Sequence, residues 1–307
     1  MPDTLLQPLF VLLWSSGYVV GSLAIQVSSP VPLLATRFVL ASLATVPLAL
    51  RTGRVRGAPL GRLAIIGLLF QVTQFGGIYG GFALGVPAGL SALVMLGLSP
   101  LVITGLAIAG GQETHDVRVW TGLVIGVAGV AIGLTPELGD ARIGGGLLLT
   151  VVGMLGLAGG SVLQKRWGAG VDPMVSAAAQ SVTGAAVMVP VLAVAGGRVV
   201  AGPQLALTLA WLGVGMGTGT LVVLVNLLAR FDASRVSALL LLVPAVTAIA
   251  SVPALGEALH PATLAGMAVS GAGVWVAIRS GKRPAGEHAR RRLVPRHRAC
   301  SRGHTPA

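Results

Sequence analysis

One charged side chain stands well inside an apolar run of the sequence. Arg37 lies seven residues after Pro30, in the run 31–50. A guanidinium surrounded by hydrocarbon is costly unless it meets carbonyl oxygens, water or an anion. Arg37 is therefore either a contact for a ligand carboxylate or a structural group that reaches the membrane interface or binds carbonyls of a broken helix. Gln180, seven residues after Pro173, is its uncharged counterpart in a later run.

Other polar and aromatic side chains within the apolar runs could face a cavity. Each of them could instead hold two helices together by hydrogen bonds, which is the common role of polar groups in lipid. The aromatic members could contact the apolar part of a ligand. Together with Arg37, the candidate substrate-binding residues are Trp14, Ser16, Tyr18, Gln71, Gln74, Tyr79, Gln164, Gln180 and Asn226.

The sequence lacks the motifs that indicate an enzyme. It contains no His-Glu-x-x-His, no Gly-Lys-Ser/Thr phosphate loop and no aspartate pair in or near the apolar runs. His297, Cys300 and His304 have a loosely metal-like spacing, but they lie in an arginine-rich tail. We therefore expect no catalytic site, no bound metal and no cofactor.

The composition predicts that lipid is the solvent for most of the chain. Of the 307 residues 54% are hydrophobic and only 10% are charged, and the mean hydropathy is +0.87. A soluble protein carries about 25% charged residues. The net charge of +12 does not indicate a nucleic-acid partner, because the Lys and Arg residues gather in short gaps between apolar runs and in the tail.

Ten runs are long and apolar enough to cross a bilayer as helices, each of about 20 residues. The connections between them are short and carry Pro, Gly or charge, and the polar segment 281–307 is expected to be a disordered basic tail. The fold class is therefore an all-α integral membrane protein. The predicted spans are 8–27, 31–50, 62–84, 87–109, 117–135, 143–164, 174–195, 205–228, 234–254 and 261–279.

An internal repeat divides these spans into two groups of five. Pro244 and Glu257 lie 144 residues after Pro100 and Glu113, and we interpret these four residues as a structural signature. The predicted domains are a first repeat, 1–136, and a second repeat, 137–280. Because five is odd, the second repeat must enter the membrane from the opposite side, which makes the repeats inverted.

The basic residues predict the orientation in the membrane. With the N-terminus inside, the inner connections and the tail carry 18 Lys and Arg residues, and the outer connections carry only Arg142 and Arg198. Cytoplasmic loops are the ones rich in Lys and Arg. We therefore expect a multi-pass protein of the cell (inner) membrane with both termini in the cytoplasm.

The glycines and the two glutamates are predicted to be structural. Glycines recur every four residues, as at Gly122 and Gly126, and such spacing marks close helix packing in lipid. Glu113 and Glu257 stand at helix ends, and we expect each to hold the start of a neighbouring helix through its backbone amides. No Asp or Glu falls in the middle of a span, so a buried carboxylate that relays protons is not predicted.

Several short motifs, in this order and spacing, resemble the drug/metabolite transporter superfamily, specifically its ten-helix EamA-type members. Gly21-Ser22 stand where that family often has a lysine, and Gln112 interrupts one Gly-Glu pair. The resemblance covers residues 8–279. Its motifs are Trp14-Ser15-Ser16-Gly17-Tyr18, Pro30 with Arg37-Phe38, Pro87-Ala88-Gly89, Gly111-Gln112-Glu113, Ala233-Ser234-Arg235 and Gly256-Glu257.

The resemblance implies a transporter that works by alternating access, with a small-molecule substrate bound near the membrane midplane between the repeats. Export of small metabolites, such as amino acids or related amphiphilic solutes, or of drugs is the leading hypothesis. Import or exchange of the same solutes stays open, as does a membrane assembly protein without transport activity. The oligomeric state is left open as well.

Overall fold

The structure is a computed structural model that describes residues 3–109, 117–137, 141–219, 223 and 239–280. Ten helical segments account for nearly all of these residues, and two of them contain π-helical stretches, η2 and η4. The segments are α1 (Asp3–Val27), α2 (Pro30–Arg51), α3–η2–α4 (Leu60–Gly67, Leu68–Gln74, Phe75–Ala83), α5 (Ala88–Ala109), α6 (Val117–Leu134), α7 (Ala141–Trp167), α8 (Pro173–Ala195), α9–η4 (Pro203–Ala210, Trp211–Gly219), η5–α12 (Leu240–Leu242, Val243–Leu255) and α13 (Pro261–Ser280).

Each segment overlaps one of the ten predicted spans, and the predicted all-α membrane fold is confirmed. Five segments are long and apolar enough to cross a membrane, and the described parts of the other five are shorter apolar helices. Proline occupies the first position of α2, α8, α9 and α13, where its missing N–H costs no helical hydrogen bond. Glu113, Asn226, the motif 233–235 and the tail 281–307 lie outside the described residues.

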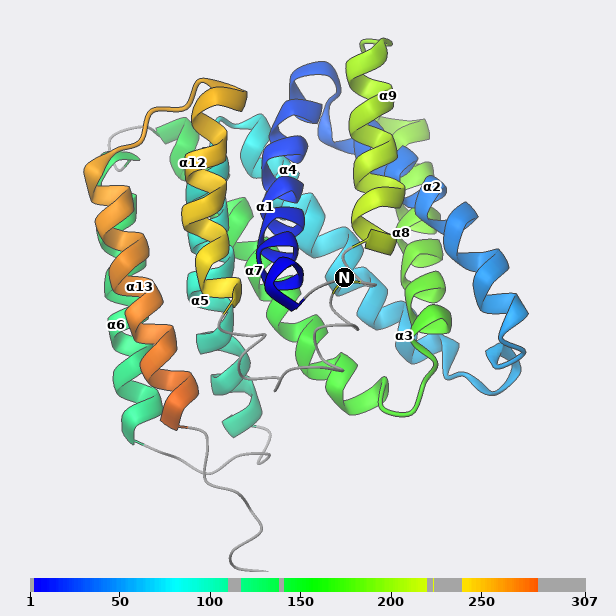
Figure 1. The fold of residues 1–307 in the computed structure, drawn as a ribbon. Helices are drawn as coiled ribbons and strands as arrows, with labels where there is room; N and C mark the ends of the chain where they lie inside the picture. The colour runs from blue at the N-terminus through cyan, green and yellow to red at the C-terminus, as the bar shows by residue number, and fades with distance from the viewer. Residues whose placement is uncertain (1–2, 110–116, 138–140, 220–222, 224–238, 281–307) are drawn as a thin grey trace, which may run out of the picture.

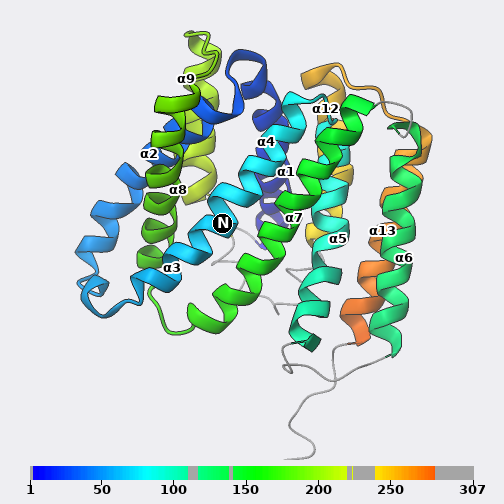
Figure 2. The same cartoon turned by 180° about the vertical axis from the view of Figure 1, so that it is seen from behind.

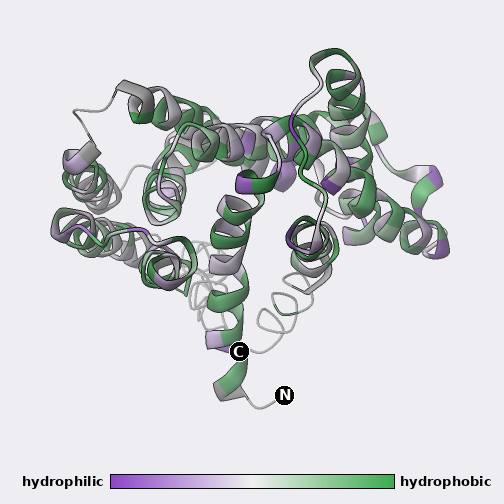
Figure 3. Ribbon diagram, turned by 90° about the horizontal axis from the view of Figure 1, so that it is seen from above, coloured by the Kyte–Doolittle hydropathy of each residue, from purple (hydrophilic) through white to green (hydrophobic). Residues whose placement is uncertain are grey.

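The helices form a bundle in which α6 and α13 run side by side along one edge. The pair α2 and α8 lies at the opposite edge, with α1, α4 and α7 between the two pairs (Figure 1 and Figure 2). Most of the helical ribbon is apolar or near neutral in hydropathy (Figure 3). Many leucines and valines, such as Val124, Val194 and Leu207, are exposed on the bundle surface, as a lipid-facing surface requires.

Small residues line the contact between α6 and α13. The position of a Cβ on Gly129 would fall on the backbone of Ser270, and one on Gly273 would fall on the backbone of Gly126. The two helix backbones therefore touch, which is how helices associate in lipid when no hydrophobic force drives them together. The predicted glycine seam at Gly122 and Gly126 lies at this contact, because Gly122 also faces Gly273.

The start of α8 is held by one aspartate with two roles. Asp172 Oδ1 accepts a hydrogen bond from the N–H of Met174 at 2.9 Å, so Asp172 is the N-cap of α8. Its Oδ2 lies 3.2 Å from Nη1 of Arg54, in the connection between α2 and α3. The Arg54 side chain is 74% exposed, so solvent screens this ion pair.

This geometry predicts that the cap contributes more to stability than the ion pair. Asp172→Ala removes both, and the lost cap alone should lower the free energy of unfolding by about 0.5–2 kcal/mol. Asp172→Asn keeps a good capping group and removes only the ion pair, so it should resemble Arg54→Ala and lie close to the wild type. Thermal unfolding of the purified variants in one detergent measures the order. Equal losses in all three variants would mean that the ion pair dominates.

Candidate functional site

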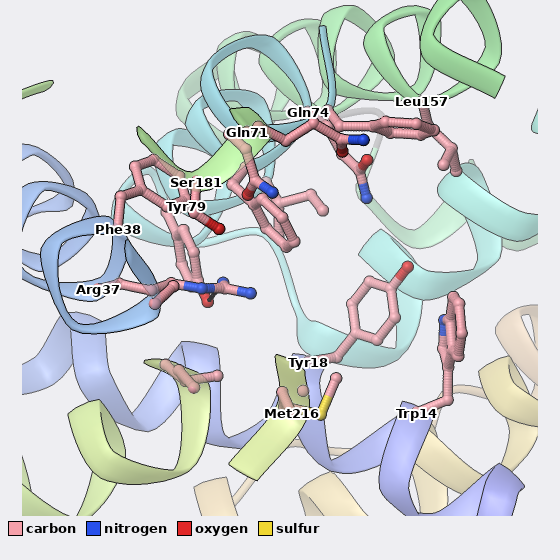
Figure 4. A pocket seen from close by; sticks show the side chains of 17 residues that line it. Trp14, Tyr18, Arg37, Phe38, Gln71, Gln74, Tyr79, Leu157, Ser181 and Met216 are labelled. Carbon is pink, nitrogen blue, oxygen red and sulfur yellow. Dashed lines mark hydrogen bonds between the residues drawn. The ribbon is translucent and has the colours of Figure 1, made fainter. Parts of the chain in front are cut away.

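A cavity of about 370 Å³ is lined by residues of both sequence halves (Figure 4). Three of its walls, α1, α2 and η2–α4, come from the first 136 residues. The other three, α7, α8 and η4, come from the second half. The lining residues are Trp14, Gly17, Tyr18, Arg37, Phe38, Ala41, Phe70, Gln71, Gln74, Phe75, Ile78, Tyr79, Leu157, Gln180, Ser181, Leu212 and Met216.

Both π-helical stretches border the cavity. Gln71 and Gln74 line it from η2, and Leu212 and Met216 line it from η4. A π-helix closes i→i+5 hydrogen bonds, so it shifts the following side chains relative to an α-helix, and such stretches are frequent at functional sites. The sequence carries no recognisable signal for either stretch.

Arg37 is held between two aromatic rings of α4. Its Nη1 donates a hydrogen bond of 2.6 Å to the hydroxyl of Tyr79, and its Cζ lies 3.9 Å from the ring centroid of Phe75. The side chain is only 8% exposed. It is the one charged residue that lines the cavity within the described chain, and it has no acidic partner there. Figure 4 shows it reaching from α2 into the cavity.

A ladder of rings fixes this arrangement. Phe75 and Tyr79 are four residues apart on α4, so they share one helix face, with ring centroids 6.2 Å apart. Phe38 packs against Phe75 at 6.3 Å, and Phe82 packs against Tyr79 at 5.9 Å. A guanidinium carries five N–H donors, and Tyr79 takes one of them, so the remaining donors of Arg37 are available to a ligand.

Gln180 belongs to a second polar group, at the contact of α7 with α8. Its Nε2 donates to Oε1 of Gln164 at 3.0 Å and to Oγ of Ser176 at 2.9 Å. Ser176 in turn donates to the same Gln164 oxygen at 3.3 Å. Gln164 does not line the cavity; it lies behind Gln180 and supports it.

Further polar side chains line the cavity without a hydrogen-bond partner in the described chain. They include Tyr18, Gln71, Gln74 and Ser181, and the Tyr18 hydroxyl points into the open space on the side of Gln74 (Figure 4). Trp14 lies beside them and tilts against Phe10, with ring centroids 5.4 Å apart. The cavity therefore offers free donors and acceptors within an aromatic wall.

The structure brings seven of the candidate binding residues to the cavity and separates Ser16 and Gln164 from it. Trp14, Tyr18, Arg37, Gln74, Tyr79 and Gln180 line it, as does Gln71. Ser16 faces another side of α1, where its Oγ accepts a hydrogen bond from Nε1 of Trp211 at 3.0 Å and donates to the carbonyl of Leu13 at 2.6 Å. Phe75 also lines the cavity and was not among the candidates; its four-residue spacing from Tyr79 was the available signal.

The three signature residues that the structure describes, Pro100, Pro244 and Glu257, do not line the cavity. Glu257 Oε1 accepts a hydrogen bond of 2.9 Å from the N–H of Ala88, at the start of α5. This contact holds the beginning of a neighbouring helix, the role expected for Glu257. Pro100 lies inside α5, and Pro244 lies in the first turn of α12.

The fold and the cavity define a multi-pass, all-helical membrane protein with a polar and aromatic site between its sequence halves. Residues 144–279 match the EamA-like transporter family. The resemblance to EamA-type transporters is thereby confirmed for this part of the chain, and it supports membrane transport as the class of function. It also points to a small-molecule substrate and away from catalysis.

Comparison with solved structures supports the fold over nearly the whole chain. One crystal structure superposes with a TM-score of 0.62 at 22% sequence identity, covering 91% of this chain and 98% of the other. At this identity the likeness establishes the fold alone. No curated protein matched the sequence.

Proposed function

We propose that the protein is an exporter of small metabolites that carry an anionic group, amino acids and related amphiphilic solutes among them. It lies in the cell (inner) membrane with both termini in the cytoplasm, and two inverted five-helix repeats alternate around the cavity. The observation that carries this proposal is the buried Arg37, which enters the cavity with no carboxylate among the described residues to neutralise it.

Electrostatics favour an anionic partner for Arg37. A guanidinium in a site of low dielectric attracts an anion far more strongly than it would in water. The planar fork of Arg matches a carboxylate, and Tyr79 and Phe75 hold that fork in one orientation. The volume of about 370 Å³ is near the lower end of ligand sites, which span about 300–1,000 Å³, so the solute is small.

The inverted-repeat mechanism is supported by matching features in the two halves. The π-stretches begin at Leu68 and Trp211, 143 residues apart, close to the repeat distance of 144. Each half also supplies one helix to the pair α2–α8 and one to the pair α6–α13. Inverted repeats that exchange conformations expose a central site first to one side of the membrane and then to the other.

Two arginines at the repeat distance make corresponding contacts at opposite ends of the bundle. Arg54 contacts Asp172, at the connection between α7 and α8. Arg198, 144 residues later, donates to the carbonyl of Gln26 at 3.0 Å, and its own carbonyl accepts from the N–H of Ser29 at 2.9 Å. Each arginine thus ties a connection of its own half to the first helix pair of the other half.

Cysteine labelling tests whether solute occupies this cavity. Gln74→Cys, in a Cys300→Ser background, is reacted with a membrane-impermeant maleimide in proteoliposomes. A panel of amino acids and toxic cations is first screened for counterflow. The first solute that shows counterflow is then added during labelling. We expect saturating solute to slow the labelling of Gln74→Cys several-fold and to leave Thr52→Cys, in an exposed connection, unaffected. Unchanged labelling of Gln74→Cys with transport intact would move the binding site elsewhere.

A further inference from the structure

We infer that the carbonyl oxygen of Gln180 accepts a hydrogen bond from an ammonium or other N–H group of the solute whose anionic group binds Arg37. This inference rests on the proposed function and assigns a separate role to Gln180. It makes Gln180 a specificity-determining residue and makes Gln164 and Ser176 positioning residues.

The first step is the direction of the Gln180 amide. A primary amide has two N–H donors, and both are used: one on Gln164 Oε1 at 3.0 Å and one on Ser176 Oγ at 2.9 Å. With the Gln164 amide oriented as in the structure, turning the Gln180 amide over would set its oxygen against the Gln164 oxygen, two acceptors facing each other. Ser176 completes the set of three hydrogen bonds. Its hydroxyl donates its only proton to Gln164 Oε1, so its oxygen can only accept from Gln180.

The second step is the free carbonyl oxygen of Gln180. It has no hydrogen-bond partner in the described chain. The polar side-chain atoms that are both sealed from solvent and unpartnered there belong to Ser91, Thr247 and Ser270, so the Gln180 oxygen is accessible. Gln180 lines the cavity and its amide nitrogen is turned toward α7, so the oxygen is the atom that a solute meets.

The third step is the contrast with the other cavity amides. Gln71 and Gln74 make no hydrogen bonds to described residues, so each can rotate to present either a donor or an acceptor. Gln180 alone among the three is fixed, and it presents only an acceptor. A solute without an N–H group leaves the fixed Gln180 oxygen without a hydrogen bond, and its binding is weakened by that loss. A freely rotating amide adapts to either kind of solute, so it does not discriminate between them.

The fourth step is the distance between the two fixed groups. Gly184 packs against the ring of Phe38, the residue next to Arg37. Gln180 lies four residues before Gly184, which is about one helical turn, or about 6 Å along α8. Arg37 on α2 and Gln180 on α8 therefore face one cavity, on two helices whose contact at Phe38 and Gly184 lies about one turn from Gln180. This arrangement suits a small zwitterion, with its anionic group at Arg37 and its amine at Gln180.

Three solutes with the same ring separate the two contacts: L-phenylalanine, 3-phenylpropanoate, which lacks the amine, and 2-phenylethylamine, which lacks the carboxylate. Binding to the purified full chain and counterflow in proteoliposomes are measured for each. We expect the wild type to prefer phenylalanine to phenylpropanoate about tenfold or more. In Gln180→Leu this preference should disappear, through weaker phenylalanine binding, while phenylpropanoate binds as before.

The positioning residues have a matched pair of variants. Gln164→Leu removes the oxygen that fixes the Gln180 amide, so the preference for phenylalanine should fall several-fold. Gln164→Glu retains an acceptor at that position and should preserve it. A loss of folded protein without a change in the preference ratio would mark these residues as merely structural and overturn their assigned role.

The outcomes also separate this inference from the proposed function. Equal binding of phenylalanine and phenylpropanoate by the wild type would overturn the role of Gln180 and leave anion binding at Arg37 intact. The role of Gln180 would also be overturned, with anion binding left intact, if Gln180→Leu weakened the binding of both solutes equally. If none of the three solutes bound, both the inference and the proposed anionic solute class would fail.

Discussion

Replacing Arg37 by glutamine is expected to weaken binding of a carboxylate-bearing solute by roughly 10- to 150-fold. The lost interaction is a hydrogen-bonded charge pair in a buried cavity, which is worth about 1.5–3 kcal/mol. Cationic solutes of similar shape should lose nothing. Affinity and transport rate, measured separately for an anionic and a cationic member of the solute panel, report the difference.

Two conservative variants refine this expectation. Arg37→Lys keeps the charge but loses the planar fork and its stacking on Phe75, so much of the activity should still be lost. Tyr79→Phe removes the hydroxyl that accepts from Arg37 Nη1 and leaves the guanidinium in place, so its loss should be smaller than that of Arg37→Gln. If Arg37→Gln lowers the transport of every solute together with the yield of folded protein, Arg37 is a structural residue.

The substitution Gly266→Ala is expected to destabilise the fold by about 1–3 kcal/mol or more. Its new Cβ would lie 2.5 Å from the carbonyl oxygen of Gly129 and from the nitrogen of Gly133, both on α6. These are backbone atoms, so no side-chain rotation relieves the overlap, and the two helices must separate. The yield of monodisperse protein and the thermal unfolding midpoint in one detergent measure the loss.

Gly271, on the same helix α13, provides the matched control. A Cβ there would meet nothing within 4 Å. Alanine also favours the helix over glycine by about 0.5–1 kcal/mol, so Gly271→Ala should leave the midpoint unchanged or raise it. The same change from glycine to alanine is therefore expected to lower the unfolding midpoint at Gly266 and to leave it unchanged or raise it at Gly271. A midpoint for Gly266→Ala equal to that of the wild type would mean that α6 and α13 do not pack this closely.

The cavity was predictable in part, and the reason differs from residue to residue. Arg37 stood out because a charge within an apolar run always needs an explanation in lipid. Ser16 and Gln71 looked alike in sequence, as polar groups within apolar runs, yet Gln71 lines the cavity and Ser16 bonds Trp211 elsewhere. The rotation of each helix about its own axis decides whether such a side chain faces the cavity. That rotation is set by packing against neighbouring helices.

The sequence by itself determined the ten apolar helical segments and where several of them begin. A bilayer imposes a fixed apolar length on each helix, and proline at Pro30 and Pro173 marks a helix start, so both are local properties of the chain. Only the tertiary structure decided that Phe75 stacks on Arg37, that Gly129 touches α13, and that Gln164 orients Gln180. Each of these contacts joins residues on different helices, and the crossing of two helices depends on all the side chains at their contact.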